Sequence, residues 1–103
     1  MEIKELQSHA MAVIAEYKDF NERHGRKVWT KQDHIEGLVG DVADLLQAAM
    51  AKDGVRESDD ADARFEHELG DCLFGVLVIA EEYGIDIEQA FGKTIAEVKA
   101  RIE

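Results

Sequence analysis

The residues best suited to chemistry lie in a short acidic pattern that occurs twice. Each copy has an acidic residue, then an Asp three residues later, then a small residue four further on. The copies are Asp41, Asp44 and Ala48, and Glu68, Asp71 and Gly75. Residues three or four apart share one face of a helix, so each copy predicts a stripe of two carboxylates and one small residue. Two such helices side by side would aim four carboxylates at one point, and the small residues would let a ligand approach them.

Acidic pairs at this spacing are also common on solvated helix faces, and 34% of this chain is charged. Two observations favour a site over a solvated face. Both pairs lie against the most apolar segments of the chain, and a small residue rather than a polar one follows each pair. A carboxylate beside a buried surface needs a partner, because an unpaired buried charge is costly.

The donor types indicate which cation would bind. Carboxylates without a His or Cys partner fit Mg²⁺ or Mn²⁺ better than zinc. The segment from His67 to Asp71 is similar to half of a zinc protease motif, but an Asp stands where the second His is required. Di-iron bundles need a His three residues after a Glu, and none of the four acids has a His there.

Four helices must position these residues. Apolar residues recur at three- and four-residue steps in four segments, which predicts helices over about 2–21, 30–51, 63–83 and 87–102. Glycines at the expected ends mark the turns, and a loop is expected from Lys52 to Ala63. Thr30 with Asp33, and Asp86 with Gln89, have the spacing of capping boxes that begin the second and fourth helices.

The fold expected is an all-α, single-domain chain over residues 1–103 that forms a four-helix bundle completed by oligomerisation. The segment from Cys72 to Ala80 is apolar all round, and a helix without a polar face must be covered on every side. Three other helices of this length would cover it poorly, so a homodimer or a homotetramer with closed symmetry is expected. Cys72, the one cysteine, is expected to be a buried structural thiol.

The net charge of −11 restricts the partners. Such a chain is repelled by nucleic acids and anionic membranes, so a phosphate-bearing ligand would need metal ions or a local basic cluster. No leader and no membrane-spanning run is evident, so a soluble cytoplasmic protein is expected. The basic group Arg23, Arg26 and Lys27 is either a solvated loop or a phosphate contact. Trp29 is either a staple for the second helix or a nucleobase platform.

Several stretches together resemble the all-α nucleoside triphosphate pyrophosphohydrolases, or MazG-like proteins, whose signature is E-x-x-E on one helix and E-x-x-D on the next. The resemblance covers most of the chain from Trp29 to Phe91. It includes Trp29-Thr30, the segment from Gly37 to Leu45, the segment from His67 to Leu73, and the segment from Tyr83 to Ile87. This sequence departs from the signature in its first pair, which is Asp–Asp.

The resemblance implies hydrolysis of a nucleoside or deoxynucleoside triphosphate between the α- and β-phosphates, often to remove unwanted nucleotides. It implies Mg²⁺ as the cofactor and Asp41, Asp44, Glu68 and Asp71 as metal ligands and catalytic residues. Lys52 and Lys93 are the candidates it suggests for phosphate binding, beside Trp29 for the base.

Three functions stay open on the sequence alone. The first is the hydrolase, with one carboxylate as a general base. The second is a nucleotide- or metal-binding regulatory protein in which the Asp–Asp pair has cost turnover. The third is a structural oligomerisation module whose acids are solvated. Pyrophosphate release from a panel of triphosphates, with and without Mg²⁺, separates them.

Overall fold

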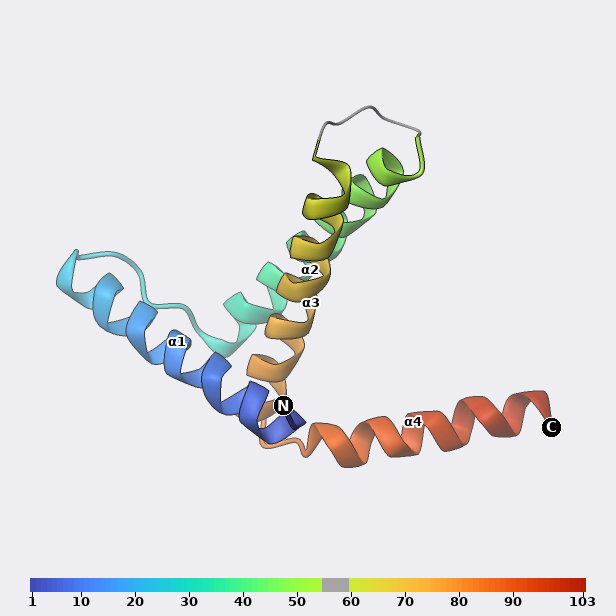
Figure 1. The fold of residues 1–103 in the computed structure, drawn as a ribbon. Helices are drawn as coiled ribbons and strands as arrows, with labels where there is room; N and C mark the ends of the chain where they lie inside the picture. Colours follow the sequence, from blue (N-terminus) through green and yellow to red (C-terminus); the bar gives the residue numbers. More distant parts are fainter. Residues whose placement is uncertain (55–59) are drawn as a thin grey trace.

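The computed structural model describes residues 1–54 and 60–103, and its described part is helical without strands. The helices are α1 (Ile3–Arg23), α2 (Lys31–Lys52), α3 (Ala61–Glu82) and α4 (Ile87–Ile102), shown in Figure 1. The all-α prediction is confirmed, with helix ends within two residues of those expected. The centre of the loop predicted between α2 and α3 lies outside the described residues. Within the described part, no helix has the length and apolar character needed to cross a membrane.

Side-chain caps fix where α2 and α4 begin. The Asp33 N–H donates to Thr30 Oγ1 at 3.1 Å, and the Thr30 N–H donates to Asp33 Oδ2 at 2.8 Å, so the predicted capping box is confirmed. The bond from the Thr30 N–H, and then Lys27, hold the pKa of Asp33 below its ordinary value. At α4, the Gln89 N–H donates to Asp86 Oδ1 at 3.0 Å, so Asp86 caps the helix as expected.

Close helix packing joins α2 and α3 along most of their length. They run antiparallel, with Leu38 of α2 seated on Gly75 of α3, where a Cβ atom would lie only 3.2 Å from Leu38 Cδ1. Ala48 is fully buried, and Val78 is 1% exposed. Small residues let two helix backbones approach, and the large side chains beside them fill the remaining space.

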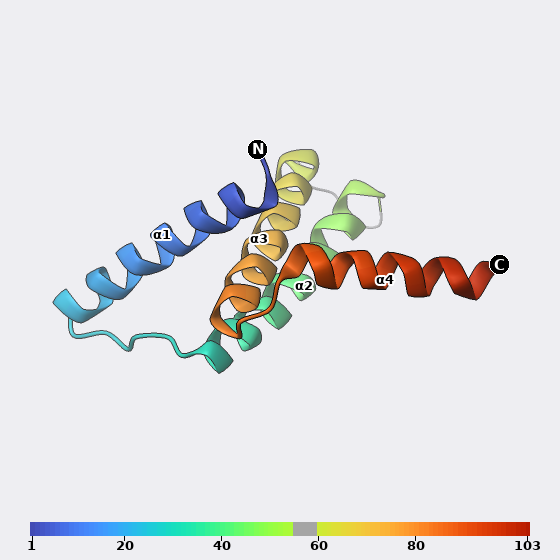
Figure 2. The same cartoon turned by 90° about the horizontal axis from the view of Figure 1, so that it is seen from below.

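The helix α1 lies against α3, and one polar bond links them. Gln7 Nε2 donates to the Leu77 carbonyl at 3.0 Å, and Ala10 of α1 is buried, as are Leu77 and Ala80 of α3. In both Figure 1 and Figure 2, α1 and α4 extend to opposite sides of the α2–α3 pair. The α2–α3 pair therefore lies between the other two helices.

The helix α4 makes almost no contact with the other three helices. Its apolar stripe is exposed, with Phe91 at 64% and Ile95, Val98 and Ile102 also open to solvent. The radius of gyration is 16.4 Å, against about 13 Å for a compact chain of this length. The four helices are thus present, but within one chain they do not close into a bundle.

A second apolar surface lies on the α2–α3 pair itself. Half of the apolar face predicted for α2 is exposed, and so is one side of the apolar α3 segment. We call this surface the hairpin face; its exposed residues are Val39, Val42 and Leu46 of α2, and Leu69, Leu73 and Val76 of α3. A single chain therefore leaves the segment from Cys72 to Ala80 only partly covered.

Gly84 tests the end of α3. Its φ is +69°, a region that costs a residue with a Cβ atom about 1–2 kcal/mol. Gly84→Ala should therefore lower the midpoint of thermal unfolding by several degrees. Gly40, inside α2, has open space around its Cβ position, so Gly40→Ala should raise the midpoint, since Ala is the better helix former. Circular dichroism melts measure both, and a Gly84→Ala midpoint at or above that of the parent would contradict the assigned turn.

Candidate metal centre

The four acids of the repeated pattern meet at one level of the α2–α3 pair. Burial raises the pKa of the Cys72 thiol, and the charges of Asp41, Glu68, Asp71 and Asp44 raise it further, in that order. One sulfur on α3 is thus within electrostatic reach of all four carboxylates. The two pairs therefore lie close enough for their charges to act on the same thiol.

The charge at this site acts on Asp41 in particular. Burial against α3 raises the pKa of the Asp41 carboxyl, and the neighbouring charges of Asp71 and Asp44 raise it further, while His67 acts in the opposite direction. Asp71 belongs to the other helix, so the repulsion crosses the helix pair. A divalent cation between the two helices would remove this repulsion.

A tighter group lies on α3 alone. His67, Glu68 and Asp71 each offer a ligand atom, and these atoms lie within 4.8 Å of one another. His67 Nε2 is 3.2 Å from Asp71 Oδ2. The sequence interpretation set His67 aside with the zinc motif, although its position four residues before Asp71 is a helical neighbour spacing. Carboxylates with one imidazole still fit Mg²⁺ or Mn²⁺, because oxygen donors dominate.

The small residues of the pattern have a different role from the one expected. They were predicted to leave room for a ligand, but Ala48 is fully buried and the Cβ position of Gly75 meets Leu38. They serve the close approach of α2 and α3. That approach is what sets the two acidic pairs opposite each other.

Cys72 lies at the same level and is half-buried. With its pKa raised by burial and by the acids around it, the sulfur stays a thiol at neutral pH. Thiolate is the reactive form, so Cys72 is unsuited to nucleophilic chemistry. The expected structural role fits this environment.

Trp29 packs beside the acidic pair of α2. Its ring covers Gly37, where a Cβ atom would lie 2.9 Å from Trp29 Cζ3, and Gly37 is one helical turn before Asp41. The ring also contacts His34, with centroids 5.7 Å apart. His34 is four residues after the cap Thr30, so the contact has the position of the expected staple. About half of Trp29 remains exposed.

The predicted phosphate-binding lysines lie away from the four acids within this chain. Lys52 Nζ donates to Asp62 Oδ1, and this bond raises the pKa of Lys52. Lys93 is exposed on α4, which extends away from the α2–α3 pair (Figure 1). Their proposed roles thus depend on elements other than this single chain.

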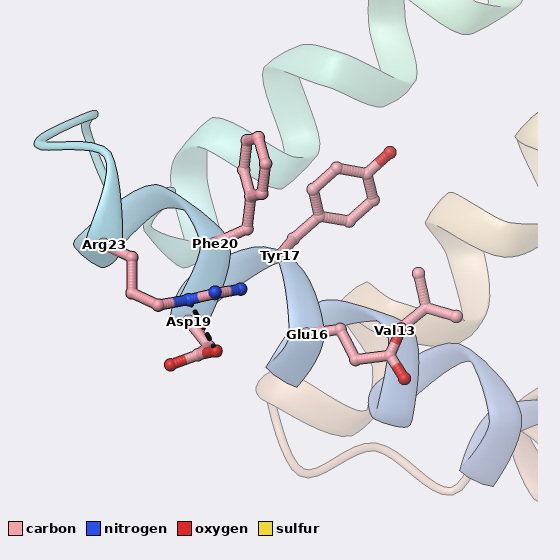
Figure 3. A pocket seen from close by; sticks show the side chains of 6 residues that line it. All are labelled: Val13, Glu16, Tyr17, Asp19, Phe20 and Arg23. Atoms are coloured by element: carbon pink, nitrogen blue, oxygen red, sulfur yellow. Dashed lines mark ion pairs between the residues drawn. The ribbon is translucent and has the colours of Figure 1, made fainter.

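The basic group before α2 is engaged by local partners. Arg23 pairs with Asp19 at 3.1 Å, Arg26 lies over the Phe20 ring, and Lys27 Nζ is 3.2 Å from Asp33 Oδ2. A hollow of about 530 Å³ follows the surface of α1 nearby, with Tyr17 and Phe20 on one side and the Asp19–Arg23 pair on the other (Figure 3). Arg23 of the basic group lines this hollow, whereas none of the four acids does.

The structure is that of a helical protein in which two acidic pairs lie on neighbouring antiparallel helices. Residues 29–103 match the family described as the MazG nucleotide pyrophosphohydrolase domain. The match covers most of the chain and includes both acidic pairs, so the chain belongs to this family. Comparison with curated proteins and with solved structures finds no significant match.

The repulsion between Asp41 and the neighbouring acids can be tested by removing the charge of Asp41. Its pKa in the folded protein is raised above the ordinary value of 3.8, so the folded state binds this proton more tightly than the unfolded chain does. Ionised Asp41 therefore lowers stability at pH 7, and this loss disappears as the pH falls below about 4. Asp41→Asn should raise the thermal midpoint of the metal-free protein in EDTA at pH 7, with a smaller gain at pH 4.

The control for this substitution is Glu66→Gln, which removes one negative charge at an exposed position of α3. Its thermal midpoint should stay within about a degree of that of the parent protein at both pH values, since isolated surface charges contribute little to stability. An Asp41→Asn midpoint equal to that of the control at pH 7 would show that Asp41 is not crowded by the other acids.

Proposed function

We propose that this protein is a metal-dependent nucleoside triphosphate pyrophosphohydrolase, which hydrolyses its substrate between the α- and β-phosphates and releases the monophosphate and pyrophosphate. The observation that carries the proposal is the set of four carboxylates around Cys72 on the α2–α3 pair. They lie inside the segment that matches the MazG family.

The ligands proposed for Mg²⁺ or Mn²⁺ are Asp41, Asp44, Glu68 and Asp71. The ion, when bound, neutralises triphosphate charge and lowers the pKa of a water. Each helix contributes two carboxylates, so the α2–α3 packing fixes their spacing before substrate arrives. Asp side chains at both positions of the first pair are one methylene shorter than Glu, so these carboxylates reach less far from α2 than a Glu pair would.

One carboxylate of this group is also the proposed general base, since a general base must lie within hydrogen-bond reach of the water that it deprotonates. His67, 3.2 Å from Asp71, is an additional group able to take up that proton. With a chain charge of −11, a triphosphate is drawn in by the cation rather than by the protein's own field.

The base of the nucleotide is proposed to lie on Trp29. The ring is next to Gly37, one turn from Asp41, and its exposed half leaves a flat apolar surface for stacking. A stacked base is worth about 1–3 kcal/mol. The aromatic platform therefore lies beside the turn of α2 that precedes Asp41.

The site predicts Mg²⁺-dependent pyrophosphate release that needs both helices. Glu68→Ala and Asp44→Ala should each reduce the rate by orders of magnitude, because each removes a charge that positions the ion. The control Glu66→Gln should keep the parent rate. Initial rates with a panel of triphosphates measure this, and helicity is checked by circular dichroism. Full turnover by both Ala variants on an active substrate would show that these acids are not the site.

We also propose that two copies of the chain pair through the hairpin face, with α4 packing on the partner copy. The hairpin face and the α4 stripe are both apolar, exposed and continuous along their helices. Burial of apolar surface contributes about 25 cal/mol per Å². A dimer in which the hairpin face and the α4 stripe are covered would therefore be stabilised. Lys93 lies on α4, so its proposed contact with phosphate depends on where α4 packs in the assembly.

Leu46, 62% exposed on the hairpin face, tests this assembly. Leu46→Glu should convert a dimer or tetramer into monomers at micromolar concentration, because a buried unpaired charge is costly. The neighbouring residue Gln47 is exposed on another side of α2, so Gln47→Glu adds the same charge and should leave assembly unchanged. Light scattering measures the mass, and a monomeric parent protein would contradict the proposal.

A further inference from the structure

A pocket of about 610 Å³ opens beside Trp29, the residue proposed to hold the nucleotide base. Its lining comes from three helices and from the segment before α2. The aromatic side chains are Tyr17, Trp29 and Phe74, and the polar side chains include Asn21, His34 and Glu82. Ligand pockets of this size combine an apolar lining with a few placed polar groups.

Two residues that line the pocket lie about one helical turn from an acid of the proposed site. Trp29 covers Gly37, one turn before Asp41, and Phe74 is one turn after Asp71 on α3. Glu82 is 11 residues after Asp71, or about 16 Å along the helix axis. A base stacked on Trp29 would lie beside His34, whose ring is 5.7 Å from that of Trp29, and so near Glu82, the hydrogen-bond partner of His34.

One polar contact lies at that far end of the pocket. His34 Nδ1 and Glu82 Oε1 are 2.7 Å apart, and their side chains are 13% and 17% exposed. This is the least exposed ion pair among the described residues. Both residues line the pocket, so the pair is within reach of a ligand bound there.

The chemistry of the pair defines what it can recognise. A carboxylate only accepts hydrogen bonds, so the Nδ1–H of His34 donates to Glu82 and fixes the carboxylate in place. The other carboxylate oxygen and the second lone pair of Oε1 remain acceptors for a ligand. Guanine carries two adjacent donors, N1–H and the 2-amino group, whereas uracil and thymine carry one N–H between two carbonyl acceptors.

We propose that Glu82, held by His34, reads the edge of the base, and that the pocket selects guanine nucleotides. The inference rests on the proposed function, since it assigns the substrate class of the same site. Both carboxylate oxygens match the N1–H and the 2-amino group, and the Asn21 amide is a donor suited to the guanine O6. A site built around such groups rejects bases that lack the matching donors.

The test compares kcat/KM for GTP, ITP and UTP with Mg²⁺. ITP keeps the N1–H and lacks only the 2-amino group. The parent protein should prefer GTP over ITP by about tenfold or more, which is the effect of one hydrogen bond to a charged group, and should disfavour UTP further. Glu82→Gln keeps the shape and an oxygen for His34, but it presents one acceptor and one donor. It should reduce the GTP to ITP ratio to below about threefold.

The matched control is Glu81→Gln, which removes the same charge one residue earlier, on an exposed side of α3. It should keep the parent ratio. The same three nucleotides are also measured for binding, as α,β-imido analogues with Mg²⁺ in a calorimeter. Circular dichroism confirms that each variant folds.

The outcomes separate this inference from the proposed function. Turnover of all three nucleotides without a guanine preference, or with a preference that Glu82→Gln leaves intact, overturns the role of Glu82 while the hydrolase stands. Binding that prefers the GTP analogue and loses the preference in Glu82→Gln, without turnover, supports the pocket and contradicts the hydrolase. If none of the three nucleotides is hydrolysed or bound, both the guanine-selective pocket and the hydrolase are contradicted.

Discussion

The close approach of α2 and α3 is the constraint on which the site depends. Leu38 packs on Gly75, and Ala48 is fully buried, so small residues at these positions let the two helices approach closely. This close approach also brings like charges near one another. Four carboxylates gather around Cys72, and their charges oppose the ionisation of Asp41 and of the thiol. A cation that binds this arrangement turns a repulsive cluster into a stabilising one.

Much of this could be predicted from the sequence because the determining signals are local. Helix periodicity, the Thr30–Asp33 box and the Asp86 cap are set by residues within a few positions of one another, and the structure confirms them. The acidic stripes follow from helical spacing alone. Their meeting across two helices could be expected once both pairs were seen beside apolar faces, and the family resemblance pointed the same way.

The features that could not be predicted from the sequence depend on packing between segments that are far apart in the chain. The small residues were assigned to ligand access, whereas they serve helix contact, a choice that spacing within one helix does not decide. His67 was set aside with a zinc motif, yet it lies beside Glu68 and Asp71. The His34–Glu82 pair joins residues 48 positions apart, and no local pattern indicates it. The separation of α4 from the other helices likewise reflects a lack of long-range contacts, since its amphipathic pattern is that of a packed helix.

The central claim is that the four acids of α2 and α3 hold a divalent cation in the folded protein, and metal-dependent stability tests it most directly. An ion that binds only the folded state at a hundredfold excess over its dissociation constant adds about 2.7 kcal/mol, or several degrees in the thermal midpoint. We expect MgCl₂ or MnCl₂ to raise the midpoint by that amount beyond NaCl of equal ionic strength, and Asp44→Asn to shrink the increment. Equal midpoints in MgCl₂ and matched NaCl would contradict the account.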